Sequence, residues 1–135
     1  MMAHIIVDSN VLLDIITEDS RWCEWSAKTV ERYADDNVLA INAVIYAEVS
    51  IGFERIEDME AALPESHLAR LSIPAEAAFL AGKCFVRYRR EGGARRSPLP
   101  DFFIGAHAAV LGASLITRDA ARYETYFPAL HLISP

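Results

Sequence analysis

Two carboxylates stand out in this sequence because their neighbours carry no formal charge. Asp101 is the only charged residue in the apolar run 98–117, and Glu48 is the only one in 41–53. A carboxylate in apolar surroundings is costly unless it is paired, hydrogen-bonded or bound to a metal ion. Each also has a structural interpretation, because Asp101 can stabilise the first turn of a helix and Glu48 can reach solvent from a helix surface.

Asp8 and Asp119 are two further acids, and each follows an apolar run that predicts a buried strand. Either acid can cap the helix that follows it, although Ser9 can cap in place of Asp8 and leave that carboxylate free. Four carboxylates that converge without a nearby lysine repel one another, and the usual solution is a hard divalent cation such as Mg²⁺ or Mn²⁺. The four acids therefore predict metal-dependent hydrolysis of phosphodiester bonds.

The elements that must position these acids alternate along the chain. Because the predicted strands are separated by helices, we expect right-handed crossovers and a parallel sheet that is covered on both faces. In such sheets ligands bind beyond the carboxyl ends of the strands. The predicted strands are 4–8, 37–42, 67–73, 114–117 and 129–133, and the predicted helices are 9–17, 21–34 with Ser20 as its N-cap, 43–52, 54–62, 74–90, 100–111 and 119–127.

Length and composition predict a single domain over residues 1–135. Hydrophobic residues make up 53% of the chain and charged residues 24%, which is typical of a compact fold with a substantial core. No apolar run approaches the roughly 20 residues that span a bilayer, and the first ten residues do not resemble a secretory signal. Two cysteines are too few for a disulfide scaffold, so we expect a cytoplasmic protein with no membrane association.

The charge of the chain is unevenly distributed. The net charge is −6, yet six of the 13 basic residues lie between positions 83 and 96. This stretch is either the solvated basic end of a helix or a local edge that attracts phosphate. Both interpretations stay open at this point.

Three segments of the sequence resemble the PIN domain, and in particular the VapC-type toxins of bacterial toxin–antitoxin pairs. They are "IIVDSNVLLDI" (5–15), "INAVIYAEVSIGF" (41–53) and "PLPDFFIGAHAAVLGASLITRDAARYETYFPALHLISP" (98–135), in the order and at the separation typical of the family. The resemblance implies a three-layer α/β/α fold around a five-stranded, mainly parallel sheet. It also implies a Mg²⁺- or Mn²⁺-dependent endoribonuclease in which the metal activates a water for in-line attack on the RNA phosphorus.

The resemblance assigns roles to individual residues. Three acids match the core acids of the family, and a fourth matches a position that varies among relatives; all four are expected at one or two metal ions. Ser9 stands where many relatives have threonine and keeps the hydroxyl group. The implied catalytic and metal-binding residues are Asp8, Glu48, Asp101 and Asp119, the supporting polar residues are Asn10 and Thr117, and the RNA contacts are Arg95, Arg96 and Arg118.

The family also implies partners. We expect an RNA substrate, homodimerisation, and a VapB-type antitoxin that inserts a peptide into the active-site groove. An alternative from another class is a non-catalytic PIN-like module that only binds a protein or RNA. That alternative predicts that no divalent ion binds to the chain.

Overall fold

The computed structural model describes residues 3–93 and 98–135. The predicted RNA contacts Arg95 and Arg96 lie outside the described residues. Within the described part, seven helices and five strands follow one another along the chain.

The five strands form one sheet in which every neighbouring pair is parallel. The strand order is β3-β2-β1-β4-β5, so β1 lies in the centre and the last strand of the chain lies at an edge. This confirms the predicted five-stranded α/β sheet. The strands are β1 (Ala3–Val7), β2 (Asn37–Ile41), β3 (Ala69–Arg70), β4 (Ser114–Ile116) and β5 (Leu132–Ile133).

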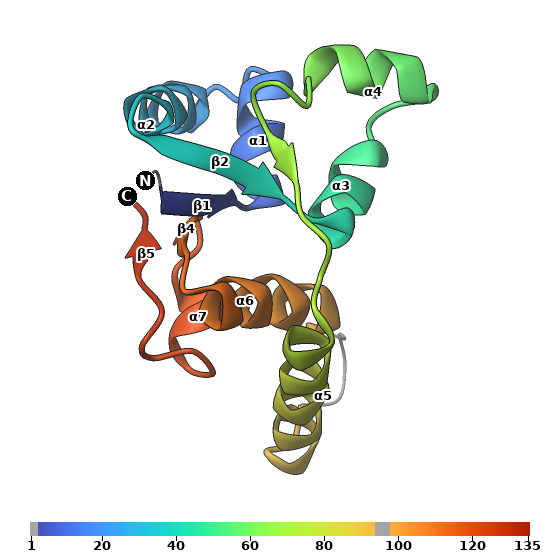
Figure 1. Ribbon diagram of the computed structural model, residues 1–135, viewed down its shortest axis with the longest axis vertical. Helices are drawn as coiled ribbons and strands as arrows, with labels where there is room; N and C mark the ends of the chain where they lie inside the picture. The colour runs from blue at the N-terminus through green and yellow to red at the C-terminus, as the bar shows by residue number, and fades with distance from the viewer. Residues whose placement is uncertain (1–2, 94–97) are drawn as a thin grey trace.

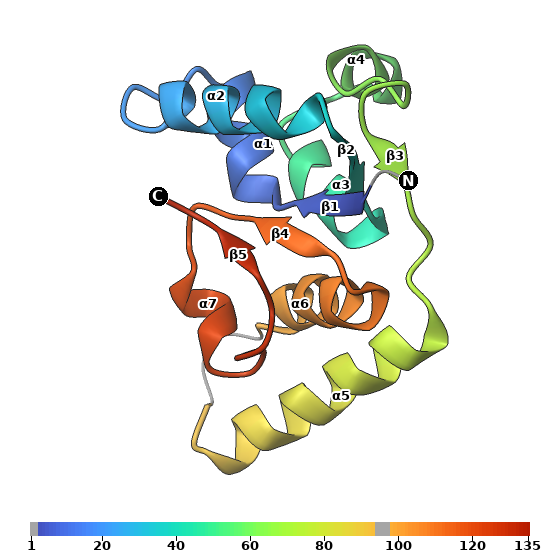
Figure 2. The ribbon, with the colours of Figure 1, turned by 60° about the vertical axis from the view of Figure 1, so that its left-hand side comes forward.

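Helices cover both faces of the sheet. Figures 1 and 2 show α1 (Ser9–Ile16) and α2 (Cys23–Ala34) on one face, and α6 (Leu99–Leu111) and α7 (Ala121–Glu124) on the other. The long helix α5 (Ala75–Arg90) packs on α6 at the outside of the molecule. The two remaining helices are α3 (Ala43–Ser50) and α4 (Ile56–Ala62).

The central strand β1 is apolar because it has sheet neighbours on both edges and helices on both faces. Ile6 and Val7 are fully buried, and Ile5 pairs with Leu39 on one side and Ser114 on the other. The chain leaves this strand at its carboxyl end, one residue before the start of α1. The strand therefore fixes the position of the residue that follows it, which is Asp8.

Two local predictions differ from the structure. Ser20 does not cap α2: the helix begins at Cys23, after Trp22, and has no side-chain cap. In the turn before the helix, Asp19 Oδ1 accepts the backbone N–H groups of Arg21 (2.9 Å) and Trp22 (2.8 Å). A carboxylate has more acceptor capacity than a hydroxyl group, so the acid takes these donors. The strand expected over 67–73 is reduced to two residues because β3 pairs only with the end of β2. No helix among residues 3–93 and 98–135 is long and apolar enough to span a bilayer.

Candidate functional site

Asp8 lies at the carboxyl end of β1 and is almost fully buried, at 1% exposure. It is the N-cap of α1, since its Oδ1 accepts the Ser9 N–H (2.7 Å). Its Oδ2 accepts the hydroxyl groups of Thr117 (2.9 Å) and Tyr123 (2.6 Å). Capping and a place in the acidic site are therefore not alternatives for Asp8, because one carboxylate does both.

Glu48 reaches the same place from α3. Its Oε1 accepts the Ser9 hydroxyl group (2.9 Å), so Ser9 joins the first two acids of the site through one side chain. Burial raises the pKa of Glu48, repulsion from Asp8 adds to this effect, and the hydrogen bond from Ser9 opposes it. Glu48 is thus a half-buried carboxylate beside another acid, as the lone charge in its segment indicated.

Asp101 lies in the first turn of α6, where a negative charge is favourable. Its side chain is 20% exposed. Burial raises its pKa to about 6, and repulsion from Asp8, Glu48 and Asp119 contributes, while the Arg122 guanidinium acts in the opposite direction. Asp101 therefore lies near enough to the other three predicted acids to be affected by their charges. We call these four acids the carboxylate cluster.

Asp119 follows β4 and faces Arg122. The Arg122 Nε lies 2.8 Å from Asp119 Oδ2, and its Nη1 lies 3.7 Å from Asp101 Oδ1. The sequence reasoning expected carboxylates with no lysine nearby, and it did not consider an arginine. In the structure Arg122 of α7 lies against two of the four acids.

The two predicted supporting residues lie between these acids. Thr117 is fully buried, and its hydroxyl oxygen accepts the Asp119 N–H (3.1 Å) while its hydroxyl proton goes to Asp8. The Asn10 amide group contacts the same hydroxyl (3.4 Å), and its Oδ1 accepts the backbone N–H of Arg118 (3.1 Å). Asn10 and Thr117 therefore hold the end of β4 against the start of α1.

Arg118 has a buried partner that the sequence reasoning did not single out. Its Nε and Nη2 donate to the two carboxylate oxygens of Asp14 at 2.8 and 3.0 Å, and Ser26 donates to the same carboxylate (2.9 Å). These hydrogen bonds raise the pKa of Arg118. The signal was present in the sequence, because Asp14 interrupts the apolar face of "VLLDII". An RNA contact by Arg118 stays a prediction.

The helices that carry Glu48 and Asp101 are joined by a buried polar pair. Asn42 caps α3 by accepting the Ile45 N–H (3.0 Å), and its amide nitrogen lies 3.1 Å from Nδ1 of His107 on α6. The amide is the donor, so the ring proton is on Nε2. Burial lowers the pKa of His107. This pair fixes α3 against α6 and thereby the spacing of the two acids.

The carboxylate cluster fits a divalent metal in its donor chemistry but not as a preformed set of ligands. Carboxylate oxygens are the ligands that Mg²⁺ and Mn²⁺ prefer. Among the residues that the structure describes, however, no three His, Cys, Asp or Glu side chains converge as a metal site. The positive charge that lies against Asp101 and Asp119 is instead that of Arg122.

Arg122 and Tyr123 are the two site residues that sequence reasoning missed. Tyr123 is fully buried and donates to Asp8, and burial raises its pKa far above its ordinary value, so the phenol keeps its proton. The available signal was the spacing in "TRDAARY": an arginine three residues after Asp119 faces that acid on a short helix.

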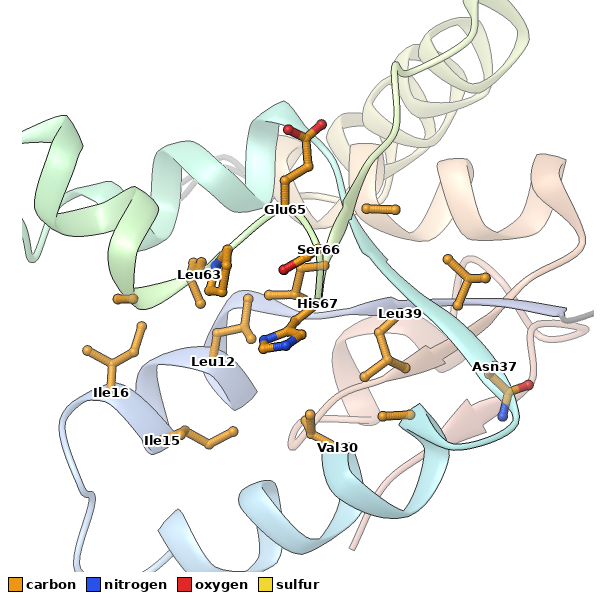
Figure 3. Close-up of a pocket in the computed structure, with 16 residues that line it drawn as sticks. Leu12, Ile15, Ile16, Val30, Asn37, Leu39, Leu63, Glu65, Ser66 and His67 are labelled. Atoms are coloured by element: carbon orange, nitrogen blue, oxygen red, sulfur yellow. The ribbon is translucent and has the colours of Figure 1, made fainter.

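A cavity of about 530 Å³ lies elsewhere, between α1, α2, β2 and the segment that connects α4 to β3. Figure 3 shows mainly apolar side chains pointing into it, among them Leu12, Ile15, Val30 and Leu39. None of the four acids lines it. The cavity and the carboxylate cluster are thus separate features of the molecule.

Comparisons with known proteins agree with this architecture. A family model of the PIN domain matches residues 5–128. A chain of VapBC2 from Rickettsia felis bound to a promoter DNA fragment has a TM-score of 0.74 at 20% identity, over 97% of this chain and 98% of that one. No curated protein matches the sequence.

Two further solved structures share the fold. A chain of DNA-bound VapBC from Salmonella typhimurium gives a TM-score of 0.71 at 19% identity over 98% of both chains. A chain of VapBC-1 from nontypeable Haemophilus influenzae gives 0.73 at 19% identity over 97% of both chains. At these identities the likeness shows the fold, while the family model spans most of the chain. The protein belongs to the PIN domain family.

Proposed function

We propose that this protein is a metal-dependent endoribonuclease and the toxin of a toxin–antitoxin pair. The observation that carries the proposal is the carboxylate cluster, above all Asp101, whose pKa is raised to about 6 by burial and by the three neighbouring acids. Acids held close together with raised pKa values are typical of functional sites. They lie beyond the carboxyl ends of β1 and β4, where open parallel sheets bind their ligands.

The proposed roles follow from the contacts of each residue. Asp8, Glu48 and Asp101, with Asp119 as a fourth acid, would hold one or two Mg²⁺ or Mn²⁺ ions. The hydroxyl groups of Thr117 and Tyr123 keep Asp8 in one orientation. When bound, the metal supplies activation of water and stabilisation of charge on the phosphodiester.

The proposed partners are RNA, a VapB-type antitoxin and a second copy of the chain. The solved relatives named above are VapBC complexes, which supports an antitoxin partner. A short neighbouring open reading frame that encodes a DNA-binding N-terminal part and an apolar, basic tail would support the toxin–antitoxin pairing.

The nuclease activity is tested with the purified chain, free of antitoxin, on a fluorescently labelled RNA. We expect cleavage with Mg²⁺ or Mn²⁺ and none with EDTA. Asp101→Asn should slow cleavage by at least about 100-fold, since even groups that only orient metal ligands contribute roughly 10–100-fold. Glu31→Gln, which removes an exposed acid on α2, should cleave at the wild-type rate. Equal rates for Asp101→Asn and wild type would refute the assignment.

A second function is a PIN-like module that binds a partner without catalysis. The ion pairs that Arg122 makes with Asp101 and Asp119 favour this alternative, because they neutralise acids that a nuclease would use for metal. It predicts no RNA cleavage in the assay above. It also predicts that isothermal titration detects no divalent-ion site.

A further inference from the structure

Arg122 is placed so that it interacts with every member of the carboxylate cluster. Its two ion pairs join α7 to Asp119 and to the first turn of α6 at Asp101. Its charge also favours the ionised forms of Glu48 and Asp101, and so opposes the rise in pKa that burial causes at both acids. In the described residues, Arg118 interacts electrostatically with Asp119 as well, but it is hydrogen-bonded to Asp14.

The contacts of Arg122 are unequal, which allows the side chain to move without unfolding its helix. The bond to Asp119 is short and lies within one turn of chain, whereas Nη1 is 3.7 Å from Asp101. The side chain is 48% exposed, so solvent can accommodate it in another orientation. The helix itself is anchored separately, since the adjacent Tyr123 is fully buried and bonded to Asp8.

Arg118 provides the contrast within the same segment. It donates two hydrogen bonds to an acid that is only 3% exposed, and losing them would leave Asp14 buried with its charge unpaired. Among the described residues, the acids that Arg122 pairs with are 20% and 40% exposed, so neither is buried as Asp14 is. Arg118 is therefore a fixed structural cation, while Arg122 can be exchanged.

We propose that Arg122 is an exchangeable counter-ion, which offsets part of the negative charge of the carboxylate cluster in the metal-free protein and competes with a divalent cation for Asp101 and Asp119. This inference rests on the proposed metal dependence. The four acids have the oxygen atoms that a divalent metal prefers, yet no preformed set of metal ligands exists among the described residues. A counter-ion that occupies the site until metal binds explains both observations. Metal binding moves Arg122 off Asp101, and the free energy of that displacement reduces the affinity for the metal.

The test measures Mn²⁺ affinity by isothermal titration calorimetry, with no RNA present. Arg122→Gln should bind Mn²⁺ about 10-fold more tightly than wild type, since removing one positive charge a few ångströms from the metal is worth about 1.4 kcal/mol, which is a tenfold change in Kd. Arg55→Gln is the matched control: Arg55 pairs with Glu57 on the surface and is 68% exposed. The control should bind as wild type does.

Thermal unfolding supplies a second readout with a distinctive pattern. In EDTA, Arg122→Gln should have a lower Tm than wild type, because the acids lose their counter-ion. With saturating Mn²⁺ it should show the larger rise in Tm, because tighter binding to the native state stabilises it more. A variant that is merely misfolded would have a lower Tm in EDTA, but its Tm would not rise more than that of wild type when Mn²⁺ is added.

The outcomes separate this inference from the proposed function. If wild type binds Mn²⁺ and Arg122→Gln binds it equally or more weakly, the counter-ion role is overturned while metal dependence stands. If neither protein binds, both the inference and the metal dependence are overturned. If Arg122→Gln binds more tightly but neither protein cleaves RNA, the inference is supported and the nuclease assignment fails.

Discussion

At the scale of single residues, the site is built around acids that differ in how they are satisfied. Asp8 accepts hydrogen bonds from Ser9, Thr117 and Tyr123, so its charge is compensated by fixed dipoles. Asp101 is half-buried in the first turn of α6, and the charged groups that act on it are one guanidinium and three other acids. In the metal-free protein, the surroundings of Asp101 therefore disfavour its charged form.

The pKa of Asp101 predicts how stability depends on pH. Because its folded-state pKa is about 6, above the value of 3.8 for an unperturbed side chain, Asp101 favours folding below pH 4, and this contribution is lost as pH rises through 6. The loss is at most roughly 3 kcal/mol. In EDTA at pH 7.5, Asp101→Asn should therefore be more stable than wild type by about 1–3 kcal/mol in urea unfolding.

The same comparison at pH 4 is the internal control, because there Asp101 is protonated in the folded protein and resembles asparagine. The difference between variant and wild type should then fall to near zero. Glu31→Gln should leave stability nearly unchanged at pH 7.5. If Asp101→Asn is less stable than wild type at pH 7.5, the surroundings of Asp101 stabilise its charged form, which contradicts the raised pKa.

The residues that could be predicted from sequence are those with a local signal. Glu48 and Asp101 stood out because each is the only charge in its apolar segment. Asp14 and Arg118 are 104 positions apart in the sequence, so no local pattern predicts that Arg118 is the partner of Asp14. Arg122 was missed for a related reason, since its contact with Asp101 depends on how α7 packs on α6.

At the scale of elements, α6 is the helix that carries most of the site's support. It contributes Asp101 in its first turn and His107 to the buried pair with Asn42, and it ends at Gly112 in a left-handed conformation (φ 72°). Gly105 allows the Phe127 ring to pack directly on its backbone. The position of this helix relative to the segment that follows α7 therefore depends on one residue that lacks a side chain.

Gly105→Ala should destabilise the protein. An added Cβ would lie 2.6 Å from Phe127 Cδ2, and the ring is buried at 5% exposure, so it has little room to move. Overpacking of this kind costs about 1–3 kcal/mol. Urea unfolding measures the change.

The matched variant is Gly82→Ala on α5. There an added Cβ meets nothing within 4 Å at an exposed position inside a helix, and alanine should stabilise the protein by about 0.5–1 kcal/mol. A pair of variants that changes stability in the same direction would contradict the proposed packing of Phe127.

Element positions were well predicted because the hydrophobic spacing of each segment matches its structure. The predicted Ser20 cap of α2 was wrong because the helix begins only at Cys23, and the hydrophobic pattern does not show that Asp19 takes the backbone donors of the turn before it. The edge strands were predicted too long because their length depends on pairing rather than on composition: β3 and β5 each pair over only two residues.

At the scale of the whole molecule, the first strand of the chain lies at the centre of the sheet, and one of its two neighbouring strands comes much later in the sequence. β1 pairs with β2 early in the chain, but its other neighbour is β4, which begins at Ser114. Thr117 and Tyr123, which bond to Asp8, lie 109 and 115 positions after it. The pairing of β1 and the hydrogen bonds of Asp8 thus both depend on the segment that contains β4 and α7.

A chain ending at residue 112 should therefore not fold cooperatively. It would leave one edge of β1 without a partner and Asp8 without two of its hydrogen-bond donors. Circular dichroism during thermal unfolding should show one sharp transition for the whole chain and none for the fragment, which also tests the prediction of a single domain over 1–135. A cooperative transition in the fragment would show that the first part of the chain folds independently.

The late completion of the surroundings of Asp8 has a consequence for synthesis on the ribosome. While β4 and α7 are still being translated, the emerging chain contains Asp8, Glu48 and Asp101 but not the strand and helix that hold them together. If the protein cuts RNA as proposed, it acquires that ability only after β4 and α7 have been made. The order of the strands would then keep the nascent chain inactive for as long as the ribosome is still translating the segments before them.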